Sequence, residues 1–211
     1  MKHSITHHTV PRETFQAVNA LLSENKVFLD DYTNQLLWWN ERINLVSRNV
    51  SRETITEHIR HSLILTKLEV FQQHDLIVDT GTGGGLPGIP LGIISPGKKF
   101  ILNDIVTKKV LALKQMVRKL DLSNIETIDN SIAEMEIDDS FLLVSKHAFK
   151  INDLFHLTNH FPWKAMVFYK GLNIEDEISG IKSPLSIAVY DLYKDSGINF
   201  YKDKAIIVVT R

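Results

Sequence analysis

LIVDTGTGGGLPGIPLGIISPGKKFILND, residues 76–104, is the stretch that decides the fold. A short apolar run ends at Asp79, and a second apolar run ends at Asp104. Between them, glycines stand at every second position: Gly81, Gly83 and Gly85. Glycine permits a sharp turn and lets the backbone approach a ligand closely, because no side chain stands in the way. The stretch therefore predicts a strand, a ligand-binding glycine loop, a helix and a second strand.

The rest of the chain after residue 73 continues this pattern of short apolar runs separated by helical or turn-rich segments. Such alternation is typical of an open, mostly parallel α/β sheet. The last two β-rich runs are separated by turn residues and predict an antiparallel pair. We expect strands at residues 76–79, 100–103, 125–128, 141–145, 165–169, 185–193 and 205–210, and helices at residues 89–94 and 108–120.

The N-terminal third has a different texture. Apolar residues recur at helical spacing through residues 13–45, with a break near residues 23–25. A further helix is expected to begin at Ser51, whose hydroxyl can cap it. The first dozen residues are polar and predict a frayed tail. We therefore divide the chain into a helical N-terminal extension, residues 1–72, packed on a ligand-binding domain, residues 73–211.

Composition limits the class of protein. The chain has 211 residues, 44% hydrophobic and 23% charged, which is enough to bury a full core. No run approaches the ~18 apolar residues of a membrane helix, and no cysteine is present, so we expect a cytoplasmic protein, a monomer without membrane contact.

Charge gives a weaker indication of partners. The net charge of −1 means that nucleic-acid binding would require a local patch. A basic run offers such a patch, although a solvated helix face is an equally good interpretation. Its members are Lys98, Lys99, Lys108, Lys109, Lys114, Arg118 and Lys119.

The glycine loop admits more than one ligand. A phosphate-binding P-loop is excluded because no Gly-Lys-Ser/Thr ending is present. A dinucleotide fingerprint can be placed on Gly83, Gly85 and Gly88, but Pro90 then follows soon after it. Asp104 can accept both ribose hydroxyl hydrogens, as an acid does in NAD enzymes too. From these residues alone, the loop binds a nucleoside ligand whose identity stays open.

A family resemblance narrows the choice. The pattern Asp-x-Gly-x-Gly-x-Gly resembles the first motif of class I methyltransferases, and VDTGTGGGLPGIPL, residues 78–91, resembles the signature of the RsmG/GidB family, the bacterial 16S rRNA guanine-N7 methyltransferases. The Leu-Pro-Gly-Ile-Pro continuation is much more specific than the glycines. Further matches, in order from about residue 36 to 171, are Trp39-Asn40, Asn44-Leu45, His58, Ser62-Leu63, Asp104, Lys108-Lys109, Ala133-Glu134, Ala148-Phe149 and Lys170-Gly171.

The resemblance implies a fold, a cofactor and a substrate. The fold is a class I (Rossmann-like) methyltransferase, a seven-stranded, mostly parallel sheet with the helical extension. The cofactor is S-adenosyl-L-methionine, the methyl acceptor is guanine N7, and the partner is 16S rRNA or the small ribosomal subunit. Asp104 would hold the ribose and Ala133-Glu134 would border the adenine. The implied cofactor-binding residues are Asp79, Gly81, Gly83, Gly85, Leu86, Asp104, Ala133, Glu134 and His147.

Two departures from the family pattern bear on activity. The family usually has arginine where this chain has Ile132 and His147. Isoleucine cannot replace a fixed cation, and histidine can do so only when it is protonated. Lys146 could supply replacement charge. A non-catalytic RNA-binding or ribosome-binding module with the same fold is therefore kept as the alternative function, and an NAD-dependent oxidoreductase as a remote one.

The candidate catalytic residues follow from the expected chemistry. Guanine N7 carries an available lone pair, so methyl transfer needs alignment rather than a general base. We expect Asn44, His58, His147 and Lys170 to orient the base or its phosphates. His58 and His61 stand one helical turn apart and could bind a metal, but two ligands alone make no site, and we expect none.

Overall fold

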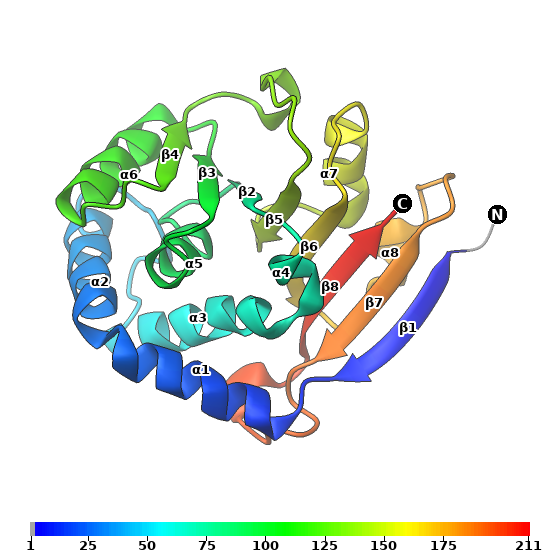
Figure 1. Cartoon of the computed structure of the whole chain (residues 1–211), viewed down its shortest axis with the longest axis horizontal. Coiled ribbons are helices and arrows are strands. Elements are labelled where there is room, and N and C mark those ends of the chain that lie inside the picture. Colours follow the sequence, from blue (N-terminus) through cyan, green and yellow to red (C-terminus); the bar gives the residue numbers. More distant parts are fainter. Residues whose placement is uncertain (1–2) are drawn as a thin grey trace.

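The computed structural model describes residues 3–211 and contains one mixed sheet of 8 strands with helices on both faces (Figure 1). The strand order is β1-β7-β8-β6-β5-β2-β3-β4, and β8 alone runs antiparallel to its neighbours. The strands are β1 (Ser4–Thr9), β2 (Leu76–Thr80), β3 (Lys99–Asn103), β4 (Ile125–Ile128), β5 (Leu142–Lys146), β6 (Ala165–Gly171), β7 (Ser186–Asp191) and β8 (Lys204–Thr210).

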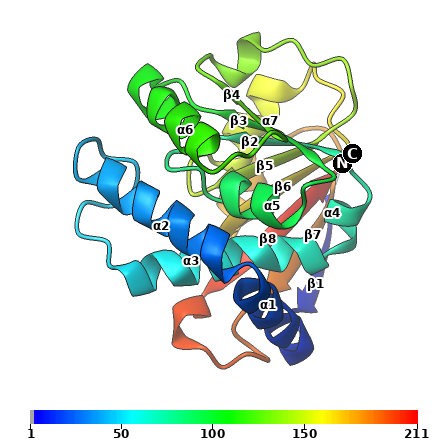
Figure 2. The same cartoon turned by 60° about the vertical axis from the view of Figure 1, so that its left-hand side comes forward.

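The helices divide between the two faces of the sheet (Figure 2). One buried apolar cluster joins α1, α2, α3, α5 and α6 to the sheet, and another joins α7, α8 and the short 3-10 helix η2 to the opposite face. In residues 3–211, none of the helices is long and apolar enough to span a membrane. The helices are α1 (Arg12–Glu24), α2 (Lys26–Asn40), α3 (Arg52–Ile64), α4 (Glu69–Gln72), α5 (Gly88–Ile94), α6 (Thr107–Lys119), α7 (Ile151–Thr158) and α8 (Glu175–Ile178), with 3-10 helices η1 (Leu65–Lys67), η2 (Ile132–Glu134) and η3 (Asn199–Tyr201).

Most predicted elements are confirmed, within a residue or two at their ends. The break near residues 23–25 separates α1 from α2 at Asn25. Ser51 caps α3 as expected, since its hydroxyl accepts a hydrogen bond from the Thr54 backbone N–H at 3.2 Å. The last two strands, β7 and β8, pair antiparallel.

The N-terminal tail corrects the sequence-based prediction. Residues 4–9 are not frayed: they form β1, which pairs in parallel with β7 from Ser4↔Ser186 to Thr9↔Asp191. The sheet therefore has 8 strands rather than seven, and the N-terminal extension is not wholly helical. The pairing was missed because β1 lies at an edge of the sheet, where its side chains stay mostly exposed and show no apolar pattern. Residues 1–2 of the predicted tail lie outside the described residues.

The N-terminal helices are tied to the sheet by buried tyrosines. The Tyr32 hydroxyl on α2 donates to the Gly84 carbonyl oxygen at 2.9 Å, and the Tyr169 hydroxyl on β6 donates to the Ser62 carbonyl oxygen on α3 at 2.8 Å. Both tyrosines are 0% exposed. A buried hydroxyl without a partner is costly, so these bonds fix where the helices sit against the glycine loop.

Candidate functional site

A cavity of about 790 Å³ opens where β2, β3 and β5 end. Ligands of open α/β sheets bind at this carboxyl edge, and small-molecule sites have volumes of ~300–1,000 Å³. The glycine loop and the segments after β3 and β5 make the walls, and the loop between α2 and α3 makes the roof. The cavity is lined by Leu45, Val46, Ser47, Val50, His58, Gly81, Thr82, Gly83, Gly84, Leu86, Asp104, Ile105, Val106, Lys109, Lys146, His147, Ala148 and Phe149.

The buried Asp79 side chain fixes the glycine loop by hydrogen bonds on the side away from the cavity. One carboxylate oxygen, Oδ2, accepts hydrogen bonds from the Thr82 hydroxyl at 2.7 Å and from the Gly88 backbone N–H at 2.9 Å. The other oxygen, Oδ1, is buried without a hydrogen-bond partner. Burial raises the pKa of Asp79 to about 7, although the bonds from Thr82 and Gly88 oppose the shift. Asp79 does not line the cavity and acts by fixing the turn.

The loop conformation favours glycine at three of its positions, because Gly81, Gly83 and Gly85 all have a positive φ. Gly81 and Gly83 have φ of +67° and +56°, a region that residues with a side chain rarely adopt. A Cβ on Gly81 would stand 2.4 Å from the Ala148 Cβ, and one on Gly83 would stand 3.0 Å from the Leu45 carbonyl oxygen. Any side chain here would therefore push the loop away from the segment after β5 or from the roof.

Asp104 links the glycine loop to the end of β3. Its Oδ2 accepts from the Gly83 backbone N–H at 3.1 Å, and its Oδ1 accepts from the Val106 N–H at 3.0 Å. The Lys109 amine lies 3.6 Å from Oδ2. Each carboxylate oxygen has further lone pairs, so the group can still accept hydrogen bonds from a ligand in the cavity.

Asn40 shapes the roof of the cavity. Its side-chain oxygen accepts from the backbone N–H groups of Leu45 and Val46, both at 2.9 Å, and its amide donates to the Ser47 carbonyl at 3.1 Å. One buried side chain thus folds the chain after α2 back over the glycine loop. A Cβ added to Gly84 would stand 2.6 Å from the Leu36 side chain, so this layer is closely packed.

Lys146 and two histidines form the wall opposite Asp104. The Lys146 amine lies 3.2 Å from Nδ1 of His58 and donates to the His58 carbonyl oxygen at 3.3 Å. Burial lowers the pKa of Lys146 to about 7, against the attraction of Asp79. Burial, followed by the Lys146 charge, lowers the pKa of His58 to about 3 and that of His147 to about 4. At these pKa values both rings are neutral near pH 7.

Several predicted site residues meet in this cavity and others do not. Those that line it are Gly81, Gly83, Leu86, Asp104, His58 and His147. Gly85 is buried under the loop, where a Cβ would stand 2.5 Å from Ile89. Ala133 and Glu134 lie in η2, outside the cavity lining.

Two of the predicted base-orienting residues have other partners. The Asn44 side chain is exposed and accepts a hydrogen bond from Arg48 at 3.2 Å in a neighbouring depression. Lys170 does end β6, as expected, but its amine forms an ion pair with Glu177 at 2.7 Å. Neither side chain lines the cavity.

Sequence reasoning missed the apolar side of the cavity. Ile105, Val106 and Phe149 line it, and Ile105 is 72% exposed. The available signal in the sequence is position, because Ile105 and Val106 directly follow Asp104 at the end of the second predicted strand. The Lys146 contact with His58 could not be found this way, since it joins residues 88 positions apart.

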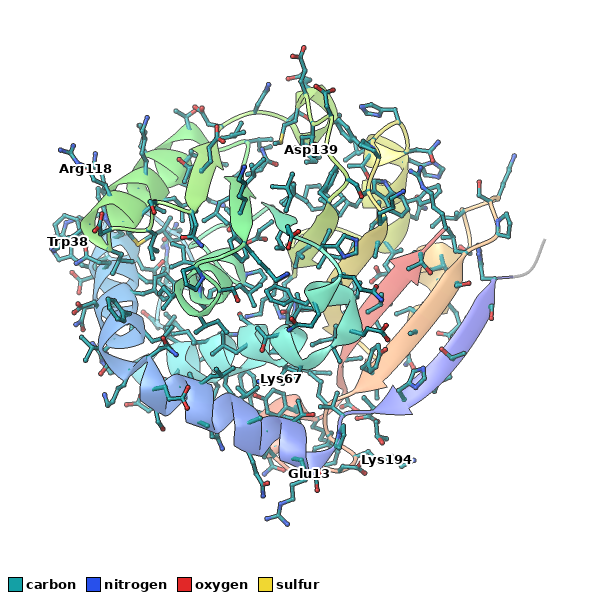
Figure 3. All side chains as sticks on the ribbon, in the orientation of Figure 1. Glu13, Trp38, Lys67, Arg118, Asp139 and Lys194 are labelled. Carbon is teal, nitrogen blue, oxygen red and sulfur yellow. The ribbon has the colours of Figure 1, made fainter. Side chains whose placement is uncertain are left out.

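The basic run is divided by the fold. Lys98 stands just before β3, where its amine donates to the His74 carbonyl at 2.6 Å, and Lys99 begins the strand. The cavity lies at the other end of that strand, five residues away, which is ~16 Å. Lys109 lines the cavity, and Arg118 points outward from the far end of α6 (Figure 3). The run is therefore not one continuous patch.

Comparison with known proteins gives the family. The family described as rRNA small subunit methyltransferase G matches residues 25–194. The chain belongs to this family. The match covers the glycine loop, Asp104 and the wall at Lys146, so every side of the cavity lies within it.

Curated relatives agree with the family match. A ribosomal RNA small subunit methyltransferase G from Chlorobium limicola is 32% identical over 176 residues, 79% of this chain and 80% of that protein. One from Haemophilus influenzae is 35% identical over 162 residues, 75% of this chain and 78% of that protein. One from Chlorobium chlorochromatii is 38% identical over 135 residues, and there the match spans 58% of the relative's length. The resemblance read in the sequence is confirmed at the level of the family.

Solved structures support the fold. MtNAS in complex with S-adenosylmethionine has a TM-score of 0.54 at 15% identity, covering 93% of this chain and 83% of that one. The METTL16 MTase domain has a TM-score of 0.53 at 13% identity, covering 81% and 76%. The expected α/β fold with a mostly parallel sheet is confirmed.

Proposed function

We propose that this chain transfers the methyl group of S-adenosylmethionine to guanine N7 of 16S rRNA in the small ribosomal subunit. The observation that carries the proposal is the cavity itself, in which a glycine loop and a buried carboxylate, Asp104, meet at the carboxyl ends of parallel strands. Its volume of about 790 Å³ suits a nucleoside cofactor and leaves room for part of a base. Membership of the family supplies the substrate class.

The cavity offers groups that fit each part of the cofactor. Asp104 would accept hydrogen bonds from the ribose hydroxyls, and the backbone of Gly81 and Gly83 would lie against the ligand. Ile105 and Val106 would cover an adenine face. Lys146 lies in the opposite wall, where its side chain is only 8% exposed. Its amine is the group that would bind the cofactor carboxylate. The roles of Asp104 and the glycine loop are those that the family resemblance implies, whereas Ile105 and Val106 take the adenine-facing place that it gives to Ala133 and Glu134.

Methyl transfer to guanine N7 requires no general acid or general base. S-adenosylmethionine supplies a methyl group on a sulfonium, which the in-plane lone pair of N7 can attack directly. The chain has to hold N7, the methyl carbon and the sulfur in line and exclude water while positive charge moves to the purine. Neutral His58 and His147 in the wall can orient the base by hydrogen bonds without opposing that charge.

A basic rim beside the cavity would receive the RNA backbone. Arg42, Arg48 and Lys108 line a depression next to the roof loop. Arg42 is held in place by stacking 3.6 Å over the Trp38 ring and by a bond to the Trp38 carbonyl. Arginine and lysine contacts to phosphates position a nucleic acid without reading its sequence.

The test is methyl transfer from labelled S-adenosylmethionine to small subunits and to naked 16S rRNA that lack the modification. Incorporation into one guanine, mapped as N7-methylguanine, supports the proposal. Tight cofactor binding with no transfer to either substrate would favour the non-catalytic binding module, which the neutral His147 and the buried Ile132 motivate. A folded protein that binds NAD but not S-adenosylmethionine would refute both.

A further inference from the structure

Histidines from two distant segments converge at one wall of the cavity. His58 and His61 stand one turn apart on α3, and His147 follows β5. One ring nitrogen from each lies within 4.8 Å of the other two. Helical spacing in the sequence predicts only that His58 and His61 lie close together. The fold brings His147 next to them.

His61 is the most unusual member of this cluster. Its side chain is 0% exposed, and both of its ring nitrogens are buried without a hydrogen-bond partner. Its neighbours are the aromatic rings of Tyr169 and Tyr201, with centroids at 4.8 and 5.7 Å. Native proteins rarely leave a buried polar group unsatisfied, so such a group requires an explanation.

We propose that His58, His61 and His147 form a binding site for a divalent transition-metal ion, Zn²⁺ by ligand type. Imidazole is a preferred ligand of zinc, and three protein ligands with an open fourth position make a reactive rather than a purely structural zinc site. His58 and His147 line the cavity, so the open position faces it. The proposal does not depend on the proposed methyl transfer, and in the metal-bound state the ring nitrogens of His58 and His147 would hold the ion instead of orienting a base.

The cluster needs only a small closure to bind an ion. Zinc–nitrogen bonds of ~2.0–2.1 Å place tetrahedral ligand atoms ~3.3 Å apart, so the widest pair must approach by ~1.5 Å. The His147 side chain keeps an exposed face and stands at the start of a loop, so it is the ligand that would move to close the site. Lys146 contacts Nδ1 of His58, so the ion must bind the other ring nitrogen, Nε2, or displace the lysine.

The consequence is a further cation in the wall that already holds Lys146. An ion held by the three histidines would add fixed positive charge facing the cavity, and its open position could take a water molecule or an anionic group such as a carboxylate or phosphate.

The test uses the full chain without a histidine tag, stripped by a chelator, dialysed and titrated with Co²⁺. We expect one Co²⁺ per chain, the intense visible absorption of a four-coordinate ion, and its displacement by Zn²⁺. His147→Ala should weaken binding by more than ~100-fold, because even the loss of a residue behind a metal ligand costs ~10–100-fold. His156→Ala, an exposed histidine on α7, is the matched control and should bind as wild type does.

A second variant keeps the test informative if the fold is sensitive. His61→Phe fills a similar volume without a ligand atom, so it should fold, bind no Co²⁺ in the cavity wall and show no rise of Tm with Zn²⁺. Equal Co²⁺ affinity in wild type, His147→Ala and His61→Phe would overturn the proposal and leave the histidines as packing residues. The weak spectrum of six-coordinate, hydrated Co²⁺ would overturn it as well.

Discussion

Replacing Asp104 with alanine should weaken cofactor binding by a calculable amount. The carboxylate already accepts the Gly83 and Val106 N–H groups at 3.1 and 3.0 Å, and these bonds aim its remaining lone pairs. A hydrogen bond to a charged group is worth ~1.5–3 kcal/mol. If Asp104→Ala removes the equivalent of one hydrogen bond to the ribose hydroxyls, the Kd for S-adenosylhomocysteine should rise ~10- to 150-fold.

Calorimetric titration of folded Asp104→Ala measures this change, and thermal unfolding measured alongside it reports any loss of stability. Asp75→Ala is the matched control, because its side chain is 100% exposed and precedes β2 at the opposite edge of the sheet. Its Kd should equal that of wild type. A folded Asp104→Ala protein that binds within twofold of wild type would show that the cofactor does not contact the end of β3.

Other predictions follow from the loop, the buried acid and the basic residues. Gly83→Val should abolish S-adenosylmethionine binding while the protein stays folded, because a Cβ there meets the Leu45 carbonyl at 3.0 Å; unchanged affinity in equilibrium dialysis would contradict this. Asp79 has a folded pKa of about 7, above its ordinary value of 3.8, so its folded form keeps a proton that the unfolded chain releases. Its contribution to stability is therefore present below pH ~4 and is lost as pH rises toward 7. In Asp79→Asn this loss of stability should be absent. The free energy of unfolding in denaturant, measured at pH 5 and pH 8, detects the difference; an equal change between the two pH values in wild type and Asp79→Asn would disprove the assignment. Lys108→Ala should reduce the slope of log RNA affinity against log salt by ~0.7–0.9, whereas Lys98→Ala, at the other end of β3, should leave it unchanged.

The sequence was sufficient for the sheet from β2 to β8 because each strand there is a local apolar run. The glycine loop and Asp104 were also predictable, since turn chemistry and an acid at a strand end are read over a few residues. β1 was not, because an exposed edge strand needs no apolar alternation and its partner lies 182 positions away, from Ser4 to Ser186. Local patterns do not specify such a pairing.

The parts of the site that could not be predicted depend on tertiary contacts. Asn40 is one polar residue at a helix end, and only the folded chain shows that it holds the roof. Lys170 was correctly predicted to lie at the end of β6. Its ion-pair partner, Glu177, lies in the segment that follows, and the pairing depends on how that segment folds back. Likewise, His147 meets His61 only because β5 ends beside α3. Sequence spacing fixes which side chains are available, and the topology decides which of them meet.

The pairing of β1 with β7 also sets an order of events during synthesis. Residues 4–9 are synthesised well before their hydrogen-bonding partners, residues 186–191, because 182 positions separate Ser4 from Ser186. Until then the nascent chain carries a strand with open backbone groups beside helices that can already pack. Because such non-local contacts form slowly, closure of this edge should be the last step of folding. A stalled or shortened chain that lacks β7 would expose the free strand to neighbouring molecules, which makes this edge the first place to look for aggregation.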